Sequence, residues 1–275
     1  MKNTIKTFAL FLTAGAMLAS CDSYLDRQPD EPLTSDNIFK KQKTTLQYLT
    51  NIYSYQPDYE APACVSNSND IPWEACSDET SFAYLDRSYT QINYNSWNPS
   101  LHIYRDDTYN TPYKGIREAN YFMQHVHECP ELTDTDKGYY YNEARFLRAH
   151  FYAMMLPVYG PVFLIGDDPV DFTQSGLDQR ERNTWDECVN YVANELWEAA
   201  KGLPDSWPDI YYGRATKGAA LAARARLLLY SARKLFNGNE LYKGIVNRNG
   251  DHLFPTQYDE KKWELAAQAA NCLLY

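Results

Sequence analysis

The chain has 275 residues, of which 44% are hydrophobic and 23% charged, a composition typical of folded globular proteins rather than of disordered ones. It carries 26 Lys and Arg against 36 Asp and Glu, a net charge of −10, so its field repels polyanions and argues against nucleic-acid binding. The 24 tyrosines are an unusual excess that requires an explanation.

The N-terminus is typical of an exported lipoprotein. Lys2 and Lys6 precede an apolar run over residues 8–18, which is too short to remain in a bilayer because a spanning helix takes roughly 20 residues. The Leu-Ala-Ser-Cys that follows matches a bacterial lipobox, in which the cysteine becomes the acylated N-terminus. The sequence therefore predicts a signal peptide over residues 1–20, an acyl anchor such as palmitate on Cys21, and a polar tether over residues 21–33. The alternative is an ordinary signal peptide followed by a chance cysteine.

Five cysteines remain after Cys21, and an odd number leaves at least one free thiol. Cys64 and Cys76 lie in one loop-like segment, where they either bridge or stay reduced. Cys188 and Cys272 lie on apolar helical faces and are expected to be buried thiols. The histidines do not pair with cysteines at ligand spacing, so no metal site is expected.

Hydrophobic periodicity predicts helices separated by one long irregular stretch. Pro112 suits a first helical turn, Thr184 and Glu187 form a capping box, and Thr216 caps another helix. Residues 54–110 are rich in Pro, Asn, Ser and Asp and are expected to form loops. The helical patterns fall at residues 34–53, 111–126, 134–157, 184–202, 216–230 and 259–275.

The order of these elements predicts an all-α fold built on helix pairs of the tetratricopeptide kind, with residues 54–110 as a long loop-rich insertion. Residues 111–156 form one pair, residues 184–230 a second, and the last helix begins a third. Such pairs bury their apolar faces by stacking on neighbours. We therefore expect residues 34–275 to be one helical domain that is incomplete at its C-terminal end.

Catalytic motifs with a defined spacing are absent from the sequence, including a nucleophile elbow, a zinc-binding His-Glu-x-x-His and a phosphate-binding loop. His125 and His127 fall on different faces of a helix, and His150 is expected to be a packed helix residue. The chain is therefore not expected to be an enzyme, and no cofactor is expected. A pair of glycosidase carboxylates cannot be recognised by spacing, so a surface glycoside hydrolase stays an alternative.

The loop-rich insertion holds the candidate binding site. Aromatic rings offer an apolar face to a sugar or a peptide side chain, while amides and charged groups hydrogen-bond hydroxyls or backbone. The alternative for each ring is that it fastens the loop to the helical body, and a helical scaffold that binds only protein is a further possibility. The proposed ligand-binding residues are Trp73, Trp97, Tyr94, Asn98, Asp70 and Arg105.

Three ordered motifs resemble the SusD and RagB family of nutrient-binding outer-membrane lipoproteins. They are residues 113–120 (YKGIREAN), residues 143–152 with 159–162 (EARFLRAHFY and YGPV), and residues 213–227 (GRATKGAALAARARL). The lipobox at Cys21 fits the same family. Glu143, Arg145 and Arg148 within these motifs are also expected to form structural ion pairs between stacked helices.

The resemblance implies a cell-surface lipoprotein of the outer membrane that binds without catalysis. It would cap a SusC-like TonB-dependent transporter and deliver captured oligosaccharide to it, or peptide in RagB-like members. Family members are longer than this chain, which would make it the N-terminal portion of a larger protein. The family's ligand contacts lie in variable loops without a motif, so the site residues proposed above come from composition.

Overall fold

The computed structural model describes residues 35–56, 77–78, 94–96, 98, 106–167 and 180–274. The chain divides into two compact units, Met1–Ile38 and Phe39–Tyr275. In the first unit the described residues form the short helix α3 (Ser35–Ile38). The described part of the second unit is helical and irregular, with one isolated antiparallel bridge between Val246 and His252. The predicted all-α fold is confirmed.

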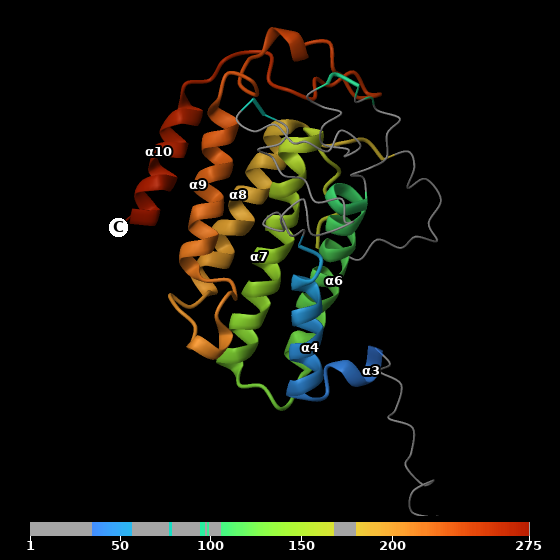
Figure 1. The fold of residues 1–275 in the computed structure, drawn as a ribbon, viewed down its shortest axis with the longest axis vertical. Helices are drawn as coiled ribbons and strands as arrows, with labels where there is room; N and C mark the ends of the chain where they lie inside the picture. Colours follow the sequence, from blue (N-terminus) through green and yellow to red (C-terminus); the bar gives the residue numbers. More distant parts are fainter. Residues whose placement is uncertain are drawn as a thin grey trace, which may run out of the picture. The chain divides into compact units, whose positions relative to one another are not determined.

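Antiparallel helices, each packed on its neighbour, make up the second unit (Figure 1). Helices α6, α7, α8, α9 and α10 contact one another in chain order, and α4 packs against α6 and α7. This is the predicted arrangement of stacked helix pairs. The longer helices are α4 (Gln42–Tyr53), α6 (Thr111–His125), α7 (Asp134–Tyr159), α8 (Trp185–Gly202), α9 (Lys217–Ala232) and α10 (Lys261–Leu274), and the short helical turns are η2 (Asp106–Asn110), η3 (Val126–Glu128), η5 (Asp209–Tyr211) and η6 (Glu240–Tyr242).

The alternating direction of the helices separates short connections from long ones (Figure 1). Residues 126–133 and 203–216 turn the chain at one end, which we call the short-turn end. Residues 160–184 and 233–260 connect helices at the other, which we call the long-loop end. The C-terminus of α4 and the N-terminus of α6 both lie at the long-loop end. The predicted insertion over residues 54–110 therefore joins two helix termini at that end.

The helix starts predicted from capping residues are confirmed. Pro112 lies in the first turn of α6, and Thr184 with Glu187 forms a complete capping box at α8. The Thr216 hydroxyl accepts from the N–H of Ala219 at 3.2 Å and caps α9. These are local interactions, which is why the sequence alone could place them.

The single helix predicted over residues 34–53 is wrong in its first part. Helix α4 begins anew at Gln42, whose backbone N–H donates to the Glu131 carboxylate at 2.8 Å. A carboxylate at this position satisfies an N–H without a partner in the helix and interacts favourably with the positive end of the helix dipole. Glu131 belongs to the connection before α7, so this start depends on tertiary structure.

Buried apolar side chains line the interfaces between the helices, and aromatic rings fill much of the space. Trp185 is fully buried, stacks on Phe236 with ring centroids 4.1 Å apart, and donates from Nε1 to the Ser231 hydroxyl at 3.0 Å. These contacts fasten the 233–260 connection to α8 and α9. Fully buried apolar residues include Ile52, Ile116, Phe122, Leu147, Phe151, Met155, Leu156 and Leu196.

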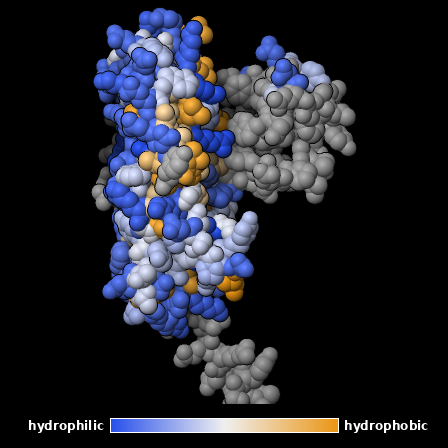
Figure 2. All heavy atoms as spheres, turned by 90° about the vertical axis from the view of Figure 1, so that its left-hand side faces the viewer, coloured by the Kyte–Doolittle hydropathy of each residue, from blue (hydrophilic) through white to orange (hydrophobic). Residues whose placement is uncertain are grey.

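The two cysteines expected to be buried differ in their exposure to solvent. Cys188 is buried, and burial raises the pKa of its thiol to about 11. Cys272 is exposed, so that prediction is wrong. It lies on α10, which buries Ala266 and Ala269 toward α9 and leaves Leu265 and Leu273 more than a third exposed. Figure 2 looks onto this side of the molecule, where hydrophobic side chains gather along the surface. The Cys64 and Cys76 pair lies outside the described residues.

His150 is a packed helix residue, as predicted. Its ring stacks on Phe146 with centroids 5.5 Å apart, and its Nδ1 is buried. Burial, with a smaller contribution from the Arg226 charge, lowers the pKa of His150 to about 4. The imidazole is therefore neutral at pH 7.

Two helical glycines provide a matched test of helix packing. A Cβ on Gly115 of α6 would meet the buried Phe151 ring at 2.5 Å, whereas a Cβ on Gly138 of α7 would meet nothing within 4 Å. We expect Gly115→Ala to lower the free energy of unfolding by about 1–3 kcal/mol because the α6–α7 interface must separate. Gly138→Ala should raise it by about 0.5–1 kcal/mol because alanine favours the helix. Urea denaturation of both variants measures the difference, and equal effects would contradict the close α6–α7 approach.

Candidate functional site

The long-loop end is the candidate site, because the predicted binding residues belong to its longest connection. Tyr94 and Asn98 are described, and both are exposed, Tyr94 by 60%. Asn95, next to Tyr94, has a left-handed backbone with φ of 55°, which marks a turn. The four other candidates, Trp73, Trp97, Asp70 and Arg105, lie outside the described residues, as does Cys21. The grouping of the six side chains therefore stays a prediction.

Residues 161–167 form the described start of the connection that follows α7 at this end. The Tyr113 hydroxyl donates to the Phe163 carbonyl at 2.7 Å and accepts from its N–H at 3.1 Å. The Tyr152 hydroxyl accepts from the N–H of Ile165 at 2.9 Å. These tyrosines project from α6 and α7, so both hydroxyls bind the segment through its backbone.

The two described segments on either side of residues 168–179 are hydrogen-bonded to each other. The N–H of Asn183 donates to the Val162 carbonyl at 3.1 Å, and its side-chain oxygen accepts from the N–H of Leu164 at 3.0 Å. The Arg182 guanidinium also donates to the Pro161 carbonyl, at 3.4 Å. The described segments 161–167 and 180–183, which we call the neck, are therefore hydrogen-bonded to each other.

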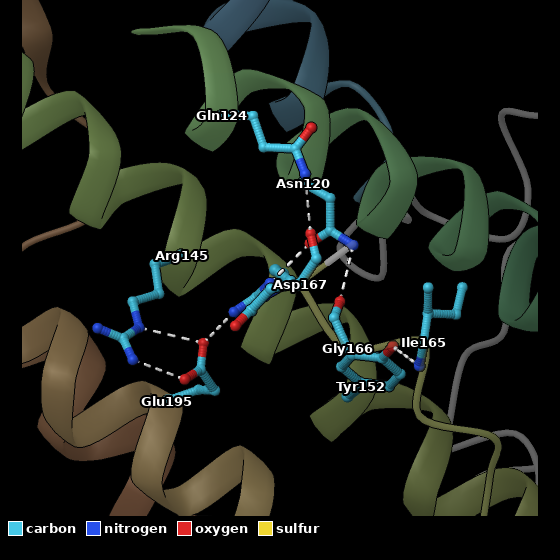
Figure 3. A network of polar contacts seen from close by, with 9 residues as sticks. Asn120, Gln124, Arg145, Tyr152, Ile165, Gly166, Asp167 and Glu195 are labelled. Carbon is cyan, nitrogen blue, oxygen red and sulfur yellow. Dashed lines mark hydrogen bonds and ion pairs between the residues drawn. The ribbon is translucent and has the colours of Figure 1, made fainter. Parts of the chain in front are cut away.

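A buried polar network lies beneath this neck (Figure 3). The guanidinium of Arg148, only 2% exposed, donates to Asn120 at 2.7 Å and to Asp167 at 2.6 Å and forms a short ion pair with Glu195. Arg145 binds the same Glu195 carboxylate through two hydrogen bonds, at 2.7 and 3.1 Å. The network joins α6, α7, α8 and the end of the 161–167 segment.

The amide side chains of Asn120 and Gln124 also bind the backbone of this segment (Figure 3). Asn120 donates from Nδ2 to the Gly166 carbonyl at 2.9 Å while its oxygen accepts from Arg148. Gln124 donates to the Asp167 carbonyl at 3.2 Å. Asn120 thus satisfies a buried arginine and a loop carbonyl at once.

The charges in the network stabilise one another. Burial by itself would raise the pKa of the Glu195 carboxyl, but hydrogen bonds from Arg145 and the charge of Arg148 outweigh it, so that pKa lies below its ordinary value. Glu195 is therefore ionised at neutral pH. Its carboxylate is shared by two guanidinium groups, which suits a structural role.

The predicted structural ion pairs of the EARFLRAHFY motif are confirmed. Arg145 and Arg148 pair with Glu195, and Glu143, which is fully buried, pairs with Arg214. The sequence analysis missed Asn120 and Glu195 as partners. The sequence did contain a signal for both residues. Each is a polar residue that falls, at helical spacing, among the apolar residues of a helix face, and the structure buries that face.

Among the described residues, no group of three or more His, Cys, Asp or Glu side chains is placed to hold a metal ion. What this end offers is a rigid neck with exposed side chains around it. Tyr94 is exposed in the 54–110 insertion, and Leu241 and Tyr258 are 85% and 59% exposed in the 233–260 connection. Rings and aliphatic groups on a fixed base can contact a ligand with little loss of conformational entropy.

Replacing Arg148 should be strongly destabilising. Arg148→Met leaves the Glu195 carboxylate with one partner and the Asn120 amide oxygen with none, so we expect the free energy of unfolding to fall by about 3–5 kcal/mol. Asp167→Asn is the matched control, because Asp167 is 83% exposed and its change should cost less than about 1 kcal/mol. Urea denaturation at pH 7 measures both. A cost below 1 kcal/mol for Arg148→Met would mean that the network does not hold the helices together.

The network should also give the fold a defined acid sensitivity. The pKa of Glu195 is lower in the folded protein than its ordinary value of 4.5, so its contribution to stability is complete above pH 4.5 and is lost as the pH falls through the folded value. We expect Glu195→Gln to reduce stability at pH 7 and to flatten the loss of stability below pH 4.5. Denaturation curves from pH 3 to 7 test this, and parallel pH profiles for the two proteins would contradict it.

Known proteins share the sequence pattern and the fold of this chain. Residues 23–229 match the SusD-like family described as "Starch-binding associating with outer membrane". No curated protein sequence matches the chain. Among solved structures, BT4246 superposes with a TM-score of 0.69 at 25% identity over 86% of this chain and 40% of its own.

Two other solved structures share the fold. A SusD-like protein from Bacteroides fragilis, BF3747, gives a TM-score of 0.61 at 26% identity over 76% of this chain and 38% of its own. A laminarin binding SusD-like protein gives 0.59 at 20% identity over 72% of this chain and 42% of its own, a likeness of fold. The chain spans about two fifths of the length of these structures. The match of residues 23–229 covers most of this chain, which belongs to the SusD-like family.

Proposed function

We propose that this chain is a cell-surface glycan-binding lipoprotein that captures oligosaccharides for import. The observation that carries the proposal is the family match over residues 23–229, whose description is starch-binding and outer-membrane association. The solved structures that share its fold include a laminarin binding protein and a surface glycan-binding protein from Bacteroides uniformis. Glycan is therefore the ligand class that we expect.

The long-loop end suits this role physically. Backbone hydrogen bonds and a buried ion-pair network fasten the connection between α7 and α8 at this end, which gives the end a fixed base. We assign ring stacking to Trp73, Trp97 and Tyr94. The hydrogen-bonding partners that we assign are Asn98, Asp70 and Arg105. Of these, Tyr94 and Asn98 are exposed.

We further propose that Cys21 carries the acyl anchor and that residues 22–33 hold the body near the outer-membrane surface. The family match begins at residue 23, two residues after the lipobox cysteine. No helix among the described residues has both the length and the apolar character needed to cross a membrane. Captured ligand would pass to a SusC-like TonB-dependent transporter without chemical change.

Ring removal tests the binding site. Trp73→Ala and Trp97→Ala should each weaken oligosaccharide binding by about 1–3 kcal/mol, by analogy with the stacking of bases on aromatic side chains. Trp263→Ala is the matched control, because Trp263 is 41% exposed on α10, away from the 54–110 insertion in the sequence. Isothermal titration calorimetry with a panel of glycans, laminarin among them, measures the change.

The same assay separates the alternatives. Binding of peptides and of no glycan would favour a RagB-like peptide carrier. Release of shorter saccharides during incubation would identify a surface glycoside hydrolase. Glycan binding that is unchanged in Trp73→Ala and Trp97→Ala would show that the site lies elsewhere.

A further inference from the structure

Asp167 carries an exposed carboxylate to which the proposed function gives no role. Its side chain is 83% exposed, yet its Oδ1 accepts a 2.6 Å hydrogen bond from Arg148, whose side chain is only 2% exposed. Other exposed acids are held less firmly. Asp205, 88% exposed, lies 3.7 Å from the ammonium of Lys217, which is itself half exposed. At Asp167, by contrast, a buried cation holds an exposed carboxylate in one place.

The backbone that carries this carboxylate is also held (Figure 3). Gln124 of α6 donates to the Asp167 carbonyl at 3.2 Å, and Asn120 of the same helix donates to the Gly166 carbonyl at 2.9 Å. Asp167 therefore cannot turn away without breaking contacts to both α6 and α7. A ligand that binds a side chain already fixed in this way loses little conformational entropy.

The surface beside Asp167 is open to another molecule. Gly166 has a left-handed backbone with φ of 80°, and a Cβ at this position would meet no atom within 4 Å. A glycine in open space lets a ligand come close to the backbone. The Oδ2 atom of Asp167 has no hydrogen-bond partner among the described residues. The exposed amide of Gln124 lies next to it, joined to the Asp167 carbonyl.

The charges around Asp167 favour an uncharged ligand. Arg145 and Arg148 contribute two positive charges to the network. Glu195 and Asp167 contribute two negative charges, so the network is neutral as a whole. A neutral group of charges attracts a distant cation only weakly, whereas a hydroxyl gains a short charge-assisted hydrogen bond to the carboxylate. A metal ion is not favoured either, because no described group of three or more ligating side chains is placed to hold one.

We propose that Asp167 and Gln124 form a sugar-contact site, at which the Asp167 carboxylate accepts hydrogen bonds from the hydroxyls of a neutral glycan. The inference rests on the proposed function, because it takes the ligand to be a glycan. Sugars carry neighbouring hydroxyls, and a fixed acceptor beside an amide that both donates and accepts can bind two of them. Gln124 belongs to the second half of α6, so the site lies along the side of the helical unit.

Binding measurements on the full chain test the contact. Asp167→Asn keeps an oxygen for Arg148 but replaces the free acceptor oxygen with an N–H donor. The dissociation constant for neutral glycans, laminarin and soluble starch among them, should rise about tenfold or more in isothermal titration calorimetry, because a hydrogen bond to a charged group is lost. Asp205→Asn is the matched control at the short-turn end and should bind like the wild type. Urea denaturation of both variants checks that the fold is retained.

Carboxylate labelling adds a readout that a purely structural role of Asp167 would not change. A carbodiimide couples glycine ethyl ester to exposed carboxyl groups, and mass spectrometry of the peptides locates the label. Bound glycan should reduce labelling of Asp167 several-fold because it covers the carboxylate. Asp205, which is equally exposed, should be labelled to the same extent with and without glycan.

The outcomes separate this contact from the proposed function. Glycan binding that is equal in the wild type and Asp167→Asn, or labelling of Asp167 that bound glycan does not change, would overturn the contact alone. Equal protection of Asp167 and Asp205 would overturn it as well. Absence of binding to every glycan of the panel would overturn the proposed function and the contact together. Weaker binding in Asp167→Asn, with binding unchanged in Trp73→Ala and Trp97→Ala, would support the contact and overturn the assignment of the rings.

Discussion

A guanidinium that is almost excluded from water must be matched by hydrogen-bonding partners, because an unpaired buried charge costs several kcal/mol. Arg148 is in this position, and its partners come from separate parts of the chain: Asn120 on α6, Glu195 on α8 and Asp167 at the end of the 161–167 segment. The helices bring these three partners to the two terminal nitrogens of the arginine only when they pack in one register. The neck of the long-loop end therefore depends on a polar contact as much as on the apolar core.

The two ends of the helical unit differ in their chemistry. At the long-loop end, hydroxyls and amides of the helices hold the backbone of the connection between α7 and α8. At the short-turn end, Arg214 and Glu143 hold a compact turn that presents Ile210 and Tyr212 outward.

Errors in the sequence-based expectations have identifiable physical causes. The helix expected over residues 34–53 is broken because Glu131 starts α4 at Gln42, a contact between residues 89 apart in the chain. Cys272 is exposed because α10 turns its alanines toward α9, so a residue on an apolar helix does not have to be buried. For the candidate site, Tyr94 and Asn98 are exposed as a ligand site requires, but composition alone could not show which side chains of the insertion lie together.

By itself the sequence determined the features that depend on neighbouring residues: the helices, the capping box of Thr184 and Glu187, the cap at Thr216 and the motifs of the SusD-like family. Those features follow from 3.6-residue periodicity and from hydrogen bonds that span three or four residues. Tertiary structure alone decided that Asn120 and Glu195 share Arg148 and that Arg214, in the connection before α9, pairs with the buried Glu143 of α7. Such pairings join residues tens of positions apart, and their stability comes from burial that exists only once the helices have packed.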